Sequence, residues 1–288
     1  MPEAGPHRFT AALVQMCSSR DVDQNIETAS ELIREAATSG AHYVQTPEVT
    51  NLIEMRSGPL FENAEPPGDN RGVRAFASLA AKLGIWLHIG SMVVKVSDEK
   101  VANRAFLFSP RGETVATYDK IHMFDVELPD GETYRESKRY QPGRSGVIAD
   151  LPWARLGLTI CYDLRFPALY AGLAQAGATL IAIPSAFTVP TGKAHWETLI
   201  RARAIETQTF VLAAAQAGHH ESGRKTYGHS MIVSPWGEVL AEGNGSSPCI
   251  VSADIDMSAI ETARSRVPSH AHHVPFDIGQ TPATGDAT

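Results

Sequence analysis

The chain has 288 residues, of which 43% are hydrophobic and 20% charged, and its formal net charge is −7. This is the composition of a globular protein with a sizeable core, and the negative charge argues against a nucleic-acid surface, which needs clustered Lys and Arg. The sequence has no apolar run near the roughly 18 residues of a membrane span, no secretory signal pattern and only three cysteines, so we expect a cytoplasmic protein without a disulfide framework.

Predicted strands and helices alternate along the first half of the sequence. We expect a strand over 9–15, a helix from Asp23 to about 37, a short strand over 43–45, a helix over 71–83, one or two strands over 85–96 and a hairpin over 105–120. The segment 121–146 is polar, rich in Pro, Gly and Glu, and longer than a loop that only connects two strands or helices. This favours a binding or active-site loop.

The second half continues the alternation. We expect a buried strand ending at 160, a helix over 167–176, a strand over 179–184, a helix over 194–207, a strand over 210–216, further strands up to 256 and a helix over 257–266. Strands mixed in this way with helices and hairpins indicate an α/β fold with mixed sheets covered by helices. We predict a single domain over 1–278 and a disordered, small and polar tail over 279–288.

The segment around Cys161 points to a reactive thiol. An apolar run over 156–160 ends abruptly at Cys161, and a helix-like segment opened by Pro167 follows. The cysteine is therefore expected in a strand-to-helix turn, where backbone N–H groups and the helix dipole could hold it partly as thiolate. The alternative is a buried cysteine that acts only as a small hydrophobe.

Two further polar residues share this placement at the end of a predicted strand. Glu48 follows the strand over 43–45, and Lys120 ends the hairpin over 105–120. If the strand ends converge, a carboxylate could take the proton of the Cys161 thiol, and a lysine could stabilise the thiolate and then an oxyanion. Taken singly, Glu48 and Lys120 could equally be solvated charges.

Three blocks of the sequence resemble a known family. They are Pro47-Glu48, Tyr118-Asp-Lys120-Ile-His-Met-Phe-Asp125 and Ile160-Cys161-Tyr-Asp-Leu-Arg165-Phe-Pro167, and they resemble the nitrilase, or carbon–nitrogen hydrolase, superfamily over about residues 9–256. The chain is most similar to the Nit branch, on the blocks 184–197, 201–207 and 227–237. This resemblance implies a four-layer α-β-β-α sandwich, with copies that pair into homodimers or homotetramers.

The resemblance also implies a cofactor-free cysteine amidohydrolase that works through a thioester. Glu48 would be the general base, Lys120 the oxyanion-stabilising cation and Cys161 the nucleophile. The backbone N–H of Tyr162 would complete the oxyanion hole. The small-molecule substrate would be an acidic amide, with deaminated glutathione favoured and the ω-amides α-ketoglutaramate and α-ketosuccinamate as alternatives.

A second active-site glutamate is expected after the lysine in this family. Glu136 fits the Nit-branch pattern best, but Glu127 and Glu132 lie in the same loop. A plain solvated loop charge is the other interpretation of Glu136.

Three residues are predicted to bind the substrate. Arg165 lies about one helical turn after the nucleophile, and an arginine is the natural bidentate partner of a substrate carboxylate. A structural salt bridge to Asp163 is the alternative. The resemblance places Phe187 and Thr191 in the substrate pocket, although either could be only a packing residue of the turn.

The remaining motifs give no metal or nucleotide site. The sequence contains no HExxH, no Cys pair, no phosphate loop and no G-x-G-x-x-G. The His219-His220 pair is an unfavourable chelator because neighbouring strand residues face opposite sides, and His270, His272 and His273 form a further cluster. Three other functions stay open: acyl transfer to an amine, attack on a nitrile, and a non-catalytic binding protein.

Overall fold

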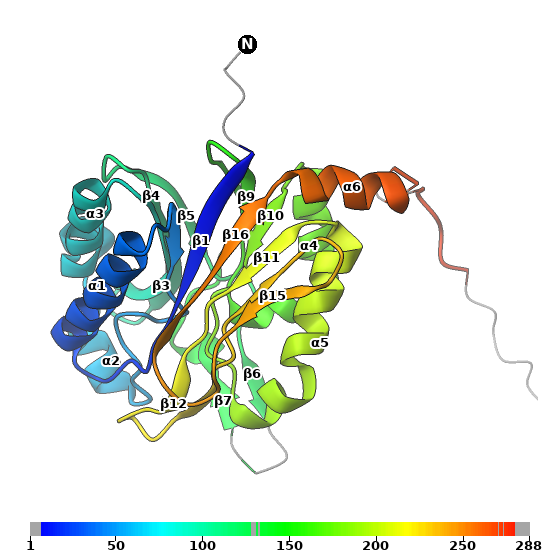
Figure 1. Cartoon of the computed structure of the whole chain (residues 1–288). Helices are drawn as coiled ribbons and strands as arrows, with labels where there is room; N and C mark the ends of the chain where they lie inside the picture. The colour runs from blue at the N-terminus through cyan, green and yellow to red at the C-terminus, as the bar shows by residue number, and fades with distance from the viewer. Residues whose placement is uncertain (1–6, 128–130, 132, 270, 273, 280–288) are drawn as a thin grey trace, which may run out of the picture.

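The computed structural model describes residues 7–127, 131, 133–269, 271–272 and 274–279. Within these residues the chain forms two six-stranded sheets that pack face to face (Figure 1). The strands of the first sheet are, in spatial order, β16 (Cys249–Asp256), β1 (Arg8–Gln15), β2 (Tyr43–Gln45), β3 (Trp86–Lys95), β4 (Val101–Phe108) and β5 (Thr114–Asp119). Those of the second are β15 (Val239–Glu242), β14 (Met231–Val233), β11 (Phe210–Ala213), β10 (Leu180–Ala182), β9 (Arg155–Leu158) and β8 (Val147–Asp150).

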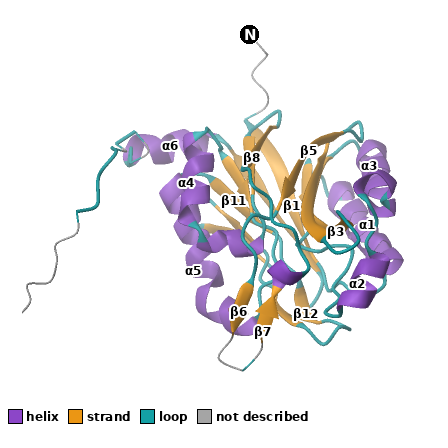
Figure 2. Ribbon diagram, turned by 180° about the vertical axis from the view of Figure 1, so that it is seen from behind, coloured by secondary structure: helices purple, strands orange, loops and turns teal. Residues whose placement is uncertain are grey.

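Helices cover the outer face of each sheet, as Figures 1 and 2 show. The first sheet carries α1 (Val22–Thr38) and α3 (Arg71–Leu83), with α2 (Ser57–Asn63) beside them. The second carries α4 (Pro167–Gln175) and α5 (Val189–Thr207), and α6 (Ser258–Arg266) follows the last strand. The order helix, sheet, sheet, helix confirms the predicted α-β-β-α sandwich.

Short elements fill the loops. They are the hairpins β6 (Asp125–Glu127) with β7 (Thr133–Arg135) and β12 (Ala217–His219) with β13 (Lys225–Tyr227), and the 3-10 turns η1 (Pro67–Asp69), η2 (Glu136–Lys138) and η3 (Cys161–Arg165). Among the helices in the described part of the chain, none is both long and apolar enough to cross a bilayer.

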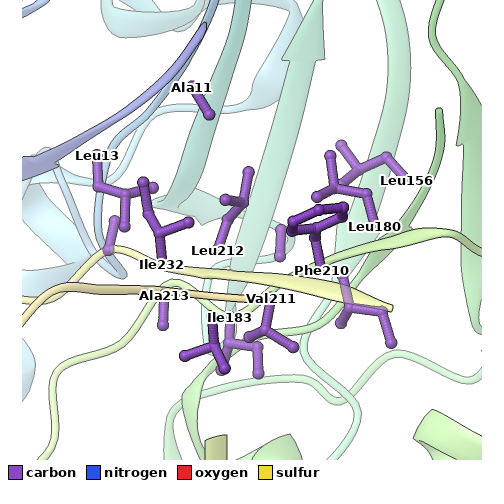
Figure 3. Packing of buried hydrophobic residues seen from close by; sticks show 14 of the residues in the cluster. Ala11, Leu13, Leu156, Leu180, Ile183, Phe210, Val211, Leu212, Ala213 and Ile232 are labelled. Atoms are coloured by element: carbon purple, nitrogen blue, oxygen red, sulfur yellow. The ribbon is translucent and has the colours of Figure 1, made fainter. Parts of the chain in front are cut away.

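The hydrophobic core covers both faces of each sheet because successive residues of a strand face opposite sides of its sheet. In β1, Ala11 and Leu13 belong to the core between the two sheets, whereas Ala12 and Val14 belong to the core under α1 and α3. Figure 3 shows side chains of both sheets meeting in the inter-sheet core. A strand that is covered on both faces needs apolar side chains at successive positions, which explains why several of the predicted strands are continuous apolar runs.

The predicted elements agree with the structure except at a few places. The helix expected from residue 194 begins at Val189, because Pro190 fits the first helical turn, where its missing N–H is not needed. The seven-residue α2 was not predicted, since it is short and has no side-chain cap. The tail predicted over 279–288 lies outside the described residues, apart from Gly279.

Strand directions bring the predicted site residues to one place. β1, β2 and β3 are parallel, and β5 runs the same way because β3, β4 and β5 alternate. In the second sheet β9, β10 and β11 are parallel. Glu48, Lys120 and Cys161 follow the carboxyl ends of β2, β5 and β9, where α/β sheets place their ligand sites.

Candidate active site

Glu48 lies in a tightly held turn after β2. Gly90 of β3 passes beneath this turn, and a Cβ atom at position 90 would lie 2.1 Å from the carbonyl oxygen of Thr46, so only glycine fits. On the other side, Nε2 of Gln216 donates a hydrogen bond to the Glu48 carbonyl oxygen at 3.0 Å. These contacts fix the backbone of a glutamate that is only 4% exposed.

Lys120 follows β5 and is buried between two carboxylates. Its Nζ donates to Oε1 of Glu48 at 2.8 Å and to both carboxylate oxygens of Glu136 at 3.0 Å. Burial alone would favour the neutral amine, but the charges of Glu136 and Glu48 outweigh it and hold the pKa of Lys120 well above its usual range. The lysine is therefore a fixed cation at the centre of the cluster.

Cys161 sits at a sharp bend between β9 and η3. Its φ of 50° lies in the left-handed region, which non-glycine residues rarely adopt and which is often found at functional sites. Its backbone N–H donates to the carbonyl oxygen of Pro184 at 2.9 Å, which ties the bend to the end of β10. The thiol lines the same cavity as Glu48 and Lys120, and both of these residues act on its pKa.

The resting charge state of the thiol differs from the sequence expectation. Burial and the nearby Glu48 charge raise the pKa of the Cys161 thiol, and the Lys120 charge compensates only in part. Burial also works against the Glu48 carboxylate, but the charges of Lys120 and Arg224 and its hydrogen bonds lower the pKa of Glu48 below 4.5. These directions favour a protonated thiol beside an ionised carboxylate that can accept its proton, and not the partial thiolate that the sequence suggests.

Glu136 is the loop glutamate that reaches this cluster. Besides pairing with Lys120, it accepts a hydrogen bond at Oε2 from the backbone N–H of Phe124 at 2.6 Å. Glu127 instead forms an exposed ion pair with Arg135, and Glu132 lies outside the described residues. The alternative of a plain solvated charge at Glu136 does not hold, because its side chain is only 13% exposed.

Arg165 lines the same cavity as the cluster. Its guanidinium lies 5.4 Å from the ring centroid of Phe187, and its Nη1 lies 3.2 Å from Nδ1 of His195. Among the residues that the structure describes, no carboxylate lies within 4.0 Å of it. The alternative salt bridge to Asp163 is excluded, because the Asp163 oxygens are occupied by Tyr118, His122 and the Ile160 N–H.

Phe187, Thr191 and Tyr162 also line the cavity, as predicted. Phe187 packs against Trp196, with ring centroids 4.9 Å apart. Thr191 lies in the first turn of α5, not in a loop, and its hydroxyl exchanges a hydrogen bond with that of Thr188 at 2.8 Å. Tyr162 belongs to η3, so its backbone follows the bend at Cys161 directly.

Comparison with known proteins identifies the family. The sequence profile described as carbon-nitrogen hydrolase matches residues 10–265, which is most of the chain. The chain belongs to the carbon–nitrogen hydrolase family.

The most similar relatives of this carbon–nitrogen hydrolase share one name. A deaminated glutathione amidase of Yersinia enterocolitica is 41% identical over 268 residues, covering 91% of this chain and 92% of that protein. The protein of the same name from Homo sapiens is 40% identical over 269 residues, covering 92% and 82%. The chain is thus an amidase of the nitrilase superfamily, a hydrolase of carbon–nitrogen bonds other than peptide bonds.

The fold has solved counterparts. The crystal structure of the C. elegans NitFhit protein matches this carbon–nitrogen hydrolase with a TM-score of 0.87 and 38% identity. The match covers 94% of this chain but 65% of that one, so the chain spans slightly less than two thirds of the NitFhit protein.

Two residues of the cavity were missed by the sequence analysis of this carbon–nitrogen hydrolase. Asn103 on β4 is 2% exposed, and its Nδ2 donates to Oε1 of Glu48 at 2.9 Å. Arg224, in the turn between β12 and β13, acts by its charge on Glu48. No group of three or more His, Cys, Asp or Glu among the described residues could hold a metal ion.

Proposed function

We propose that the chain hydrolyses linear amides of acidic substrates, with deaminated glutathione as the favoured substrate, through a thioester on Cys161. The observation that carries this proposal is the buried cluster of Glu48, Lys120 and Glu136 against the Cys161 thiol. It faces a cavity that also contains the guanidinium of Arg165. The shared name of the most similar relatives supports the choice of substrate.

In the acylation half, Glu48 takes the proton of the Cys161 thiol while sulfur attacks the amide carbon. The carbonyl π electrons move to oxygen, and the Lys120 ammonium and the Tyr162 backbone N–H stabilise this oxyanion. As the carbon–nitrogen bond breaks, Glu48 returns the proton to nitrogen, and ammonia or an amine departs. The direction of the pKa shifts supports this order, since the resting proton is on sulfur and the base is ionised.

In the deacylation half, Glu48 deprotonates a water molecule that attacks the thioester carbon. The carbon–sulfur bond breaks, and the sulfur recovers its proton from Glu48. Glu136 also binds the Lys120 ammonium, so the ammonium keeps its position while the Glu48 carboxylate is briefly neutral. Glu136 thus supports both halves of the cycle without transferring a proton.

Incubation with deaminated glutathione tests this proposal directly. We expect release of α-ketoglutarate and cysteinylglycine, and a transient adduct of the α-ketoglutaryl group on the peptide that contains Cys161. Liquid chromatography and mass spectrometry of acid-quenched samples measure both. Product release with the adduct on another residue, or no turnover of any ω-amide, would contradict the mechanism. Turnover of α-ketoglutaramate alone would replace the favoured substrate by the ω-amidase alternative.

Arg165 is proposed to bind the carboxylate beside the keto group of the substrate. Replacing it with methionine, which keeps much of the apolar stem, should raise the KM for acidic ω-amides by about 10- to 100-fold, because a charge-assisted hydrogen bond contributes about 1.5–3 kcal/mol. Steady-state kinetics with α-ketoglutaramate and with a neutral amide of the same length measures this effect. An equal rise of KM for both amides would contradict the carboxylate role.

Three other expectations stay predictions. The first is the family resemblance's implication that copies of the chain pair into a homodimer or homotetramer. The free thiols of Cys17, Cys161 and Cys249 suit a reducing compartment, and we propose the cytoplasm. Attack on nitriles and acyl transfer to an amine would use the same Glu48, Lys120 and Cys161. Product analysis with a nitrile, or with an added amine acceptor, separates these reactions from amide hydrolysis.

A further inference from the structure

Arg224 is a charged residue of the cavity to which the proposed chemistry gives no role. It lies in the turn of the β12–β13 hairpin and lines the same cavity as Cys161 and Arg165. Its Nη2 donates to the carbonyl oxygen of Ala186 at 2.5 Å, and its guanidinium lies 5.6 Å from the ring centroid of Tyr134. These contacts fix the position of the Arg224 side chain.

The hairpin that carries Arg224 is anchored at several points. His220 at the start of the turn bonds with Nδ1 to the Ser18 carbonyl oxygen at 2.9 Å and with Nε2 to the Thr226 hydroxyl at 2.7 Å. The backbone N–H of Tyr227 donates to the carbonyl oxygen of Phe187 at 3.0 Å. These bonds hold the turn beside the segment that contacts both the nucleophile and Arg165.

The guanidinium of Arg224 has unused binding capacity. Within the described residues no carboxylate pairs with it, and its buried Nε has no hydrogen-bond acceptor. A guanidinium carries five N–H donors in a planar fork that suits a carboxylate. A cation that lines a cavity, with donors unused and no carboxylate in hydrogen-bond contact with it, indicates an anionic group on the ligand.

Arg224 and Arg165 line the same cavity as Cys161, and the charge of Arg224 is one of those that lower the pKa of Glu48. The favoured substrate, deaminated glutathione, has one carboxylate on its acyl part and another on its amine part. Since Arg165 is proposed for the carboxylate of the acyl part, the guanidinium of Arg224 is available for the carboxylate of the amine part.

We propose that Arg224 binds a carboxylate on the leaving amine, so that the preferred substrates are amides with an acidic group at both ends. This inference rests on the proposed function and narrows its substrate class. The leaving group would be an acidic amine, such as a short peptide with a free carboxyl terminus. Simple ω-amides that release ammonia lack this contact.

Two probes that differ in one charge test the inference. The first is deaminated glutathione, and the second is the same molecule with its terminal carboxylate converted to a carboxamide, so the acyl part and the scissile amide are identical. For the unaltered protein we expect kcat/KM to be about 10- to 100-fold higher for the acid than for the carboxamide, which is the usual effect of one charge-assisted hydrogen bond. In Arg224→Met this ratio should fall close to one, and Arg224→Lys should keep part of it.

The ratio of kcat/KM for the acid to kcat/KM for the carboxamide separates two roles of Arg224: recognition of the terminal carboxylate, and its effect on the pKa of Glu48. Loss of the Arg224 charge raises the pKa of Glu48, but this changes both probes alike and cancels in the ratio. Arg139→Met is the matched control, because Arg139 lines the same cavity but its Nη1 donates to the Met55 carbonyl oxygen at 2.7 Å. We expect this control to keep the ratio.

Each other outcome overturns the inference. Equal kcat/KM for the two probes in the unaltered protein would remove the contact while leaving the proposed function intact. If the ratio stays high in Arg224→Met, another residue binds the terminal carboxylate. If the ratio falls as much in Arg139→Met as in Arg224→Met, the preference reflects general attraction by the positive charges of the cavity. If neither probe is hydrolysed while α-ketoglutaramate is, the favoured substrate itself fails, and this inference fails with it.

Discussion

Cys161→Ala is expected to lower the turnover of acidic amides by at least about 10⁴-fold, as removal of the nucleophile does in other hydrolases that work through a catalytic triad. The alanine keeps Glu48 and Lys120 in place but leaves no atom to form the thioester. Cys161→Ser should be similarly impaired, because the hydroxyl proton is held far more tightly than that of a thiol. Product release measured over hours, with and without enzyme, gives the ratio.

The other two cysteines provide the controls for this experiment. Cys17→Ala and Cys249→Ala change half-buried thiols outside the cavity lining, so they should retain turnover. Circular dichroism should show the same fold for all the variants, because Cys161→Ala removes only one sulfur atom from the core. More than a few per cent of residual activity in Cys161→Ala, or loss of activity in Cys17→Ala, would move the nucleophile to another residue.

The protonation pattern of the site explains why such a buried cluster can be both stable and reactive. The Lys120 ammonium contacts the carboxylates of both Glu48 and Glu136, so neither carboxylate is buried without a positive partner. A thiolate would add a further buried negative charge without a new counter-ion. The resting site avoids this by keeping the proton on Cys161, and the negative charge forms on sulfur only when the substrate is there to receive it.

The position of the three central residues was predictable from the sequence because each one follows a predicted strand. A polar residue or a cysteine at the end of a strand marks the edge of the sheet. Glu48, Lys120 and Cys161 all have this signature, and the parallel directions of β2, β5 and β9 turn it into proximity. The local pattern therefore indicated that the three residues could meet, and the family resemblance supplied their roles.

Residues whose role depends on tertiary contacts could not be predicted in this way. Asn103 lies within β4, where a polar residue is expected simply to face the other side of the sheet, and nothing local links it to Glu48. Arg224 lies in a polar turn typical of solvated hairpins. The pKa of Cys161 could not be predicted for the same reason: its sequence neighbourhood favours a thiolate, but burial and the charge of Glu48, which is distant in sequence, raise the pKa of the thiol.

Asp163→Ala is the substitution outside the reacting groups with the largest expected cost. The carboxylate of Asp163 is fully buried and accepts at Oδ2 from the Tyr118 hydroxyl at 2.7 Å and from the Ile160 N–H at 2.9 Å. At Oδ1 it contacts the backbone N–H of His122 at 3.1 Å and its Nδ1 at 2.7 Å. It thus joins the segment around Lys120 to the bend at Cys161.

Alanine at position 163 leaves these groups buried without partners, so we expect the free energy of unfolding to fall by about 3–5 kcal/mol. Urea denaturation measures the loss. Tyr118→Phe removes only one bond and should cost about 1.5–3 kcal/mol. Asp150→Ala changes an exposed aspartate, 81% exposed and paired with Arg155, and should cost less than about 1 kcal/mol. If Asp163→Ala were as mild as Asp150→Ala, the link between the two catalytic segments would have to lie elsewhere, since a carboxylate that satisfies buried donors on both segments cannot be removed without leaving them unpaired.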